Sequence, residues 1–207
     1  GEQPVQWAEF SLTESYYDRN GKADKYPDFS VNKEFSKVKE QWIVQTGVGI
    51  YCSPAVEGDK VFVGDAMGYL TAYTLKNGKK LWNFQSGKRI IGTPAVSEGI
   101  VVFGSADRNI YGLNAMNGQL LWKVEAKEPV IGAVTIDKGV AYVGASDHTF
   151  RAIDVHTGKV VWSYDKVKGY IETKPLIADN KVIFGAWDNT LYALDKTNGK
   201  ECWKWNG

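Results

Sequence analysis

The sequence is poor in the residues that metal sites and most catalytic sites require. Its 207 residues include two histidines and two cysteines. It contains no C-x-x-C pair, histidine cluster or H-E-x-x-H spacing, so the residues indicate no zinc site. Cys52 and Cys202 stand at unrelated positions of the repeat described below, and we therefore expect no disulfide between them. No serine or cysteine nucleophile lies in a recognisable catalytic pattern, so no catalytic residue is assigned.

The sequence also lacks an excess of charge and a long hydrophobic run. Lys and Arg number 25 against 24 Asp and Glu, which gives a formal net charge of +1. This balance offers no electrostatic basis for nucleic acid or an anionic membrane as the main partner. No run of about 20 apolar residues predicts a membrane span, and the start, GEQPVQW, has no signal segment. Because a processed start would look the same, this does not argue for the cytoplasm.

Glycine and aromatic residues are abundant, and they recur at a fixed period. The 22 glycines and 13% aromatic content favour short strands joined by tight turns. In each of the last four repeats Ala or Gly stands ten residues before a Trp, and a Gly stands four residues before it. A period of about 40 residues is typical of β-propellers. The recurring tryptophans are Trp42, Trp82, Trp122, Trp162 and Trp203.

Each repeat predicts four short antiparallel strands. The second strands read KVFVG, IVVFG, VAYVG and KVIFG, where β-forming residues run into a terminal turn glycine. The third and fourth strands are joined by KNG, MNG, HTG or TNG, whose Gly can take the positive φ of a hairpin turn. Four such strands make one propeller blade. The sequence therefore predicts an all-β fold with blades at about 43–82, 83–122, 123–162 and 163–203.

The best-preserved repeat resembles a known family. Its A-x-D-x-x-T-G-x-x-x-W pattern, with Ala152, Asp154, Thr157, Gly158 and Trp162, resembles the tryptophan-docking motif of pyrroloquinoline-quinone-type (PQQ-like) propeller repeats. The resemblance covers residues 42–203. It implies that each outer-strand indole packs against the neighbouring blade, with the small residue making room. A structural docking role follows for Trp42, Trp82, Trp122, Trp162 and Trp203.

The family resemblance also predicts an incomplete ring. Such propellers usually close with seven or eight blades, so four complete repeats predict about half of a ring. Two alternatives are that two copies complete an eight-bladed ring, or that four blades close as in hemopexin-like domains. The favoured interpretation is a fragment of a longer propeller, because open blade edges would expose apolar surface that a monomer seldom tolerates. Self-association through these edges is the corresponding partner prediction. Residues 1–40 lack the period and are predicted to be a linker or the tail of an upstream domain, with the propeller segment over 41–207.

Candidate ligand-binding residues lie in the loops before the first strand and after the second strand of each repeat. In a propeller these loops meet on one face. Aromatic and cationic side chains there suit a protein, peptide or carbohydrate ligand. For Trp187 the favoured interpretation is that it caps the core of its blade. Aspartates in the same loops are interpreted as turn formers. The candidates are Arg89, Arg108, His148, Lys168, Tyr170 and Trp187.

Three functional hypotheses follow. The favoured one is a non-catalytic binding or scaffolding module, periplasmic or otherwise extracytoplasmic, resembling the propeller of bacterial outer-membrane assembly lipoproteins. The alternative is an accessory segment of a larger enzyme with an upstream catalytic domain such as a metallophosphoesterase. The third and least favoured is a piece of a quinone-dependent dehydrogenase, because adjacent cysteines that would stack on the quinone are missing. No cofactor and no metal are expected.

Overall fold

The computed structural model describes residues 40–207, so the linker predicted over residues 1–40 lies, except for Glu40, outside the described residues. Residues 55–206 form sixteen strands in four antiparallel sheets, each ordered as its strands occur along the chain. This confirms the predicted all-β class and the four blades of four strands. Residues 40–207 contain no helix, and hence none that could cross a membrane.

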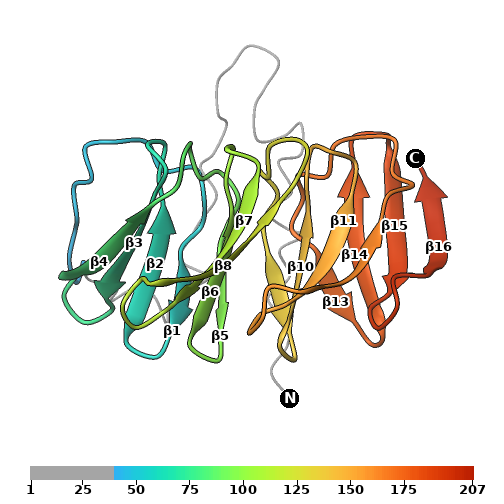
Figure 1. The fold of residues 1–207 in the computed structure, drawn as a ribbon. Helices are drawn as coiled ribbons and strands as arrows, with labels where there is room; N and C mark the ends of the chain where they lie inside the picture. The colour runs from blue at the N-terminus through green and yellow to red at the C-terminus, as the bar shows by residue number, and fades with distance from the viewer. Residues whose placement is uncertain (1–39) are drawn as a thin grey trace, which may run out of the picture. The chain divides into compact units, whose positions relative to one another are not determined.

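The strands have closely similar lengths from sheet to sheet (Figure 1). The first sheet contains β1 (Ala55–Glu57), β2 (Lys60–Gly64), β3 (Tyr69–Thr74) and β4 (Lys80–Gln85). The second contains β5 (Ala95–Ser97), β6 (Ile100–Gly104), β7 (Asn109–Asn114) and β8 (Leu120–Glu125). The third contains β9 (Thr135–Asp137), β10 (Val140–Gly144), β11 (Phe150–Asp154) and β12 (Val160–Tyr164). The fourth contains β13 (Leu176–Ala178), β14 (Lys181–Ala186), β15 (Thr190–Asp195) and β16 (Glu201–Asn206).

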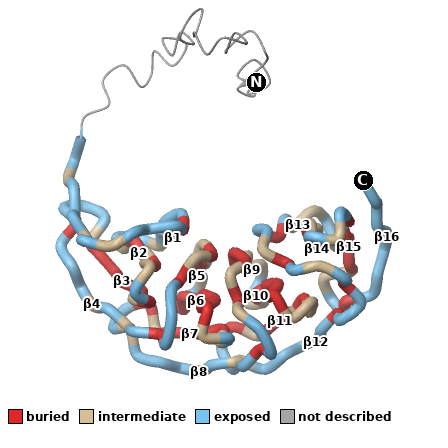
Figure 2. Tube along the Cα trace, turned by 90° about the horizontal axis from the view of Figure 1, so that it is seen from above, coloured by how far each residue is buried: buried red, intermediate tan, exposed pale blue. Residues whose placement is uncertain are grey.

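The four sheets of residues 55–206 form an open arc (Figure 2). The short first strands lie on its inner side and the last strands on its outer side. Along the inner side β1 contacts β5, β5 contacts β9 and β9 contacts β13. The first and fourth sheets do not meet, which contradicts the alternative of a sealed four-bladed ring.

The core lies between neighbouring sheets because both faces of each middle strand are apolar. In β6 all five residues, Ile100–Gly104, are buried. Between the third and fourth sheets the rings of Phe150 and Phe184 stack with centroids 4.0 Å apart. Phe150 is fully buried, and burying a ring of this size contributes a few kcal/mol. Packing against the next sheet therefore stabilises strands that are only three to six residues long.

Trp82, Trp122 and Trp162 each contact the next sheet. Trp82 Nε1 donates to Ala115 O of the next sheet at 3.2 Å. Its ring lies over Gly118 at a turn with φ 75°, where an added Cβ would be 2.5 Å from Trp82 Cε3. Trp122 and Trp162 repeat this arrangement with the following sheets, at 2.6 Å to Val155 O and 3.0 Å to Lys196 O.

The small residue ten places before each Trp is its cross-strand partner in the same sheet. Gly112 pairs with Trp122, and Ala152 pairs with Trp162. An added Cβ on Gly112 would lie 2.1 Å from Trp122 Cε2, so this position leaves little room beside the indole. The register shifts by one residue directly after the small residue in every sheet. The repeat thus encodes a bulge next to each indole.

Candidate functional site

Two sets of loops meet at one end of the sheets. Because Tyr69 at the start of β3 pairs with Gln85 at the end of β4, the β2–β3 loop and the β4–β5 connection lie at the same end. The other sheets repeat this geometry, and the loops line the upper edge of Figure 1. All six candidate ligand-binding residues belong to these loops.

The backbone fixes the two sets of loops against each other. Ala106 N donates to Arg89 O at 3.0 Å, and Ser146 N donates to Pro129 O at 2.9 Å. In the fourth sheet Trp187 N donates to Tyr170 O at 3.0 Å. Arg89, Pro129 and Tyr170 are therefore equivalent residues of successive repeats, held at corresponding places around the arc.

Three loop aspartates make a contact that the sequence interpretation missed. Asp107, Asp147 and Asp188 each accept a hydrogen bond from the N–H two residues later, as turn formers do. Each also accepts one from a backbone N–H twenty residues upstream, just after the outer strand of the preceding sheet. The donors are Gly87 at 2.6 Å, Lys127 at 3.1 Å and Lys168 at 2.9 Å. These aspartates therefore link neighbouring blades as well as closing turns.

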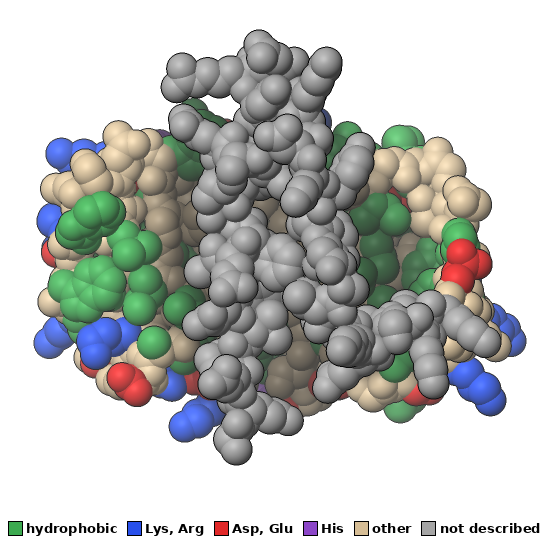
Figure 3. Space-filling view, turned by 180° about the vertical axis from the view of Figure 1, so that it is seen from behind, with side chains coloured by type: hydrophobic (Ala, Val, Ile, Leu, Met, Phe, Trp, Pro, Cys, Tyr) green, Lys and Arg blue, Asp and Glu red, His purple; other side chains and the backbone are tan. Residues whose placement is uncertain are grey.

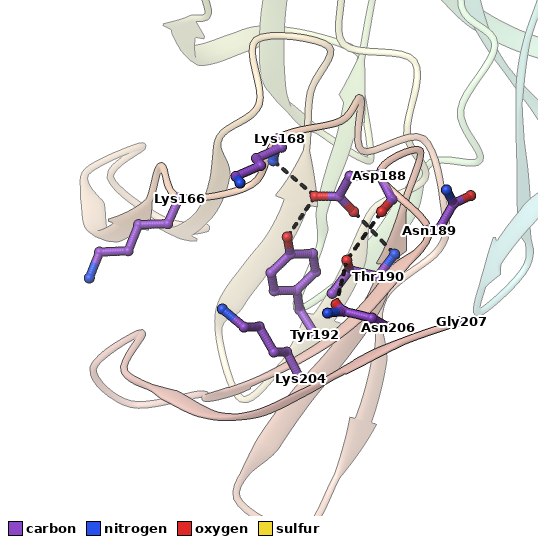
Figure 4. A pocket seen from close by; sticks show the side chains of 9 residues that line it. All are labelled: Lys166, Lys168, Asp188, Asn189, Thr190, Tyr192, Lys204, Asn206 and Gly207. Atoms are coloured by element: carbon purple, nitrogen blue, oxygen red, sulfur yellow. Dashed lines mark hydrogen bonds between the residues drawn. The ribbon is translucent and has the colours of Figure 1, made fainter.

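A side chain four residues later completes each aspartate site. Tyr192 Oη donates to Asp188 Oδ2 at 2.6 Å, as Figure 4 shows, and Tyr111 does the same to Asp107 at 2.7 Å. At Asp147 the partner is the guanidinium of Arg151, with one contact of 3.0 Å. The side chain of Asp147 is 1% exposed and that of Arg151 11% exposed, so this ion pair is well shielded from water.

These contacts keep the carboxyl groups ionised. Burial opposes ionisation of Asp188, but hydrogen bonds from Tyr192, Lys168 N–H and Thr190 outweigh it, so its pKa lies below its usual range. In turn, burial together with the bond to Asp188 raises the pKa of Tyr192 to about 12. The pKa of Asp147 is likewise lowered, because the bonds from Arg151, Lys127 N–H and Thr149 N–H outweigh burial. The pKa of Asp107 is also lowered, because bonds from Tyr111, Gly87 N–H and Asn109 outweigh burial, so none of the three aspartates has the raised pKa of a general acid.

A cavity of about 480 Å³ lies between these loops. It brings together three of the six candidates, Arg89, His148 and Tyr170. The imidazole of His148 and the ring of Tyr170 have centroids 5.4 Å apart. A second hollow of about 420 Å³ shares Arg89 with the first and is lined by the exposed Met67. The remaining wall of the first cavity comes from Ala106, Glu128, Pro129, Ile131 and Ser146.

The other three candidates lie outside this cavity. Lys168 lines a separate pocket of about 370 Å³ with Lys166 and Lys204, beside Asp188 (Figure 4). Arg108 is exposed and lines none of the three cavities. Trp187 is 70% exposed, which contradicts the interpretation that it caps the core of its blade.

Some cavity residues carried no recognisable signal in the sequence. Pro129 and Glu128 are ordinary loop residues, and Met67 looks like a variant of the Asp that other repeats carry. Superposing the repeats could have found Pro129, because it occupies the position of Arg89 and Tyr170. Glu128 and Ile131 could not have been found, since their place in the wall depends on the angle between sheets.

Neither cysteine forms a disulfide: Cys52 is a buried thiol and Cys202 an exposed one. Cys52 Sγ accepts from Gly64 N and donates to Gly64 O, both at 3.3 Å, and burial raises its pKa. Within residues 40–207 no group of three or more His, Cys, Asp or Glu side chains is arranged to hold a metal ion.

The repeat and its open arc define a PQQ-like propeller segment. The chain belongs to the family whose model is described as outer membrane protein assembly factor BamB, which matches residues 34–129 and 66–206. A comparison with curated proteins finds no match.

Solved structures share the fold. BamB from Moraxella catarrhalis is 19% identical with a TM-score of 0.72, over 79% of this chain and 52% of that one. The computationally designed Ika8 protein is 25% identical with a TM-score of 0.68, over 74% of this chain and 48% of that one. Quinohemoprotein alcohol dehydrogenase ADHIIG from Pseudomonas putida HK5 is 15% identical with a TM-score of 0.69, over 80% of this chain and 35% of that one. The chain thus spans about half the length of the solved BamB.

Proposed function

We propose that residues 41–207 form a non-catalytic binding or scaffolding module that takes a protein or peptide ligand on its loop face. The observation that carries this proposal is the cavity of about 480 Å³ that joins Arg89, His148 and Tyr170. Its size is that of a small ligand site or of a pocket for a few side chains of a larger partner. The family description, an assembly factor, favours a protein over a carbohydrate.

The chemistry of the cavity suits a segment with an acidic and an apolar side chain. Arg89 is exposed and can bind a carboxylate through two N–H groups. Tyr170 is 49% exposed and presents a rigid ring beside His148. Aromatic rings and arginine are the residues that most often dominate binding energy at protein interfaces. Arg108, Lys168 and Trp187 lie farther out on the same face and are proposed to contact the rest of a larger ligand.

The loops are ordered before a ligand arrives. Each is held by a backbone bond to its neighbouring loop, and three are also held by an interblade aspartate. A preorganised surface loses less conformational entropy on binding. Rigid scaffolding of this kind supports the binding proposal rather than a catalytic one, since the aspartates are occupied by structural partners.

The structural and cellular parts of the proposal rest on the repeat and the family. We propose that the motif tryptophans couple neighbouring blades, that the open blade edges are self-association surfaces, and that the protein acts outside the cytoplasm. The indole contacts of Trp42, Trp82, Trp122 and Trp162 support the first part. The family description, which refers to the outer membrane, supports a periplasmic location.

A peptide selection tests the loop face. A phage-displayed library of random peptides is selected on the 207-residue protein, and binders are measured by fluorescence anisotropy. Replacing both Arg89 and Tyr170 by Ala is expected to weaken binding at least tenfold, because the cation and the ring are both lost. Lys200→Ala, in the turn before β16 at the opposite end of the sheet, is the matched control and should leave binding unchanged. Selected peptides that bind the double variant as tightly as the unmodified protein would exclude this cavity as the site.

A further inference from the structure

The three internal sheet boundaries define one docking geometry. In each, the indole N–H of an outer-strand Trp donates to a carbonyl 33 or 34 residues later, at 2.6–3.2 Å. The indole also lies over a turn glycine of the next sheet, where an added Cβ would be 2.5–2.7 Å from the ring. We call this carbonyl and this glycine a docking slot. The slots of the second, third and fourth sheets are filled by Trp82, Trp122 and Trp162.

The slot of the first sheet is filled in the same way by Trp42. Trp42 Nε1 donates to Leu75 O at 2.9 Å, and an added Cβ on Gly78 would lie 2.6 Å from Trp42 Cε3. The setting differs, because residues 40–54 form no strand and Trp42 therefore belongs to no sheet. Its neighbour Ile43 is 62% exposed. An indole held by one short segment is more easily displaced than one anchored in a four-stranded sheet.

The fourth sheet presents an indole that fills no slot in the described part of the chain. Trp203 pairs with Ala193 as the other motif tryptophans pair with their small residues. It is nevertheless 40% exposed, whereas Trp122 is 8% exposed. No carbonyl of residues 40–207 accepts its N–H.

Two further positions of the fourth sheet show the same contrast. Leu191 corresponds to Phe150 and is 38% exposed against 0%, while Trp205 corresponds to Tyr164 and is 64% exposed against 6%. Figure 3 shows hydrophobic side chains gathered on this flank, at the left of the view. In the preceding sheets these positions face the next blade. The exposed face of the fourth sheet therefore has the composition of a blade interface.

We propose that Trp42 is an intramolecular cap on the slot of the first sheet, and that Trp203 of a second copy of this chain competes with it for Leu75 O and Gly78. A second copy fits because Trp203 repeats the residue, strand position and small cross-strand partner that fill the other slots. Two copies would also supply about the full length of BamB or Ika8, of which one copy covers 52% and 48%. With two-fold symmetry the fourth sheet of each arc meets the first sheet of the other, so the contacts close and no open-ended chain of copies forms.

The cap sets the concentration at which copies associate. A competing group on the same chain acts at an effective concentration in the millimolar range. Trp42 therefore prevails in dilute protein, and association is expected to be weak until Trp42 is removed. This inference concerns the ends of the arc and does not depend on the loop-face function.

Oligomeric state tests the cap. Size-exclusion chromatography with light scattering is run on the 207-residue protein over a micromolar concentration series. The unmodified protein is expected at its monomer mass of 23.0 kDa, and Trp42→Ala is expected to form dimers with at least tenfold higher affinity. Trp42→Ala combined with Trp203→Ala should return to monomer. Trp42→Ala combined with Trp187→Ala, which alters an exposed loop-face indole, should remain dimeric.

Each other outcome contradicts the proposal. If the Trp42→Ala protein is monomeric, Trp203 does not compete with Trp42 for the slot of the first sheet. If dimers persist without Trp203, this residue does not make the contact between copies. An unmodified protein that dimerises as tightly as Trp42→Ala would show that Trp42 is no cap. If Trp42→Ala does not fold, Trp42→Phe takes its place, because Phe keeps an aromatic ring and loses the hydrogen bond to Leu75 O. Trp42→Phe should dimerise more tightly than the unmodified protein. Equal affinity of the two proteins would contradict the cap. Trp42 contacts Leu75 and Gly78, and Trp203 lies within β16, so neither belongs to the loop face. Trp42→Ala and Trp203→Ala should therefore leave the peptide-binding assay unchanged, and the two proposals fail separately.

Discussion

Trp122 has the deepest burial of the motif tryptophans in residues 40–207, and its N–H bond to Val155 O is buried as well. Replacing a large buried aromatic residue by Ala removes its packing and leaves a cavity. Trp122→Ala is expected to lower the free energy of unfolding by about 3–5 kcal/mol. Urea denaturation followed by circular dichroism measures this value.

Trp187→Ala is the control for that substitution. It removes the same side chain from a site that is 70% exposed, and a change within about 0.5 kcal/mol is expected. Equal effects of the two substitutions would show that Trp122 does not hold the second and third sheets together.

At the scale of the element, the β10–β11 loop is fixed by Asp147. Its carboxylate binds Lys127 N–H of the preceding blade and the guanidinium of Arg151. These contacts lower its pKa in the folded state below the value of about 3.9 of an unfolded chain. A lowered folded pKa means that the carboxylate stabilises the fold at pH values above about 4, and that this contribution is lost as pH falls through the folded pKa.

Asp147→Asn keeps the shape of the side chain and removes its charge. At pH 7 it is expected to cost about 1–3 kcal/mol, because the shielded guanidinium of Arg151 loses its carboxylate partner and keeps only its bond to Thr149 O. It should also make stability less dependent on pH below about 4. Urea denaturation at a series of pH values measures both effects. Asp59→Asn, at a side chain that is 79% exposed, should cost less than about 0.5 kcal/mol, and a cost as large as that of Asp147→Asn would contradict the assigned role of the β10–β11 loop.

At the scale of the whole arc, each sheet packs only against its neighbours in sequence, as in repeat proteins. Within the described residues the second and third sheets are covered on both sides, whereas all six residues of β16 are exposed. Hydrogen exchange followed by mass spectrometry should therefore show the strongest protection in β6 and β10 and the weakest in β16. Equal protection of β16 and β6 would indicate a cover over the fourth sheet.

The loop aspartates have one role that the sequence predicts and one that it does not. Asp107, Asp147 and Asp188 were correctly interpreted as turn formers, because an Asp bond to the N–H two residues later is a local feature. Their second role depends on an N–H twenty residues away in another blade, which no local pattern reveals. The cavity also depends on contacts between blades. Its residues Arg89, His148 and Tyr170 are among the six candidates from the sequence. That these three share one cavity, whereas Arg108, Lys168 and Trp187 lie outside it, depends on the angle between the sheets.

By itself the sequence determined the strands, the turns and the four-strand repeat, because those follow from alternation, turn glycines and a fixed period of about 40 residues. The tertiary structure decided the rest. It made the arc open rather than sealed, placed Arg89, His148 and Tyr170 around one cavity, and put Trp42 into a slot that the other repeats fill from a sheet. These properties depend on the angle and the contacts between sheets, and the residue pattern within one repeat does not predict such long-range packing.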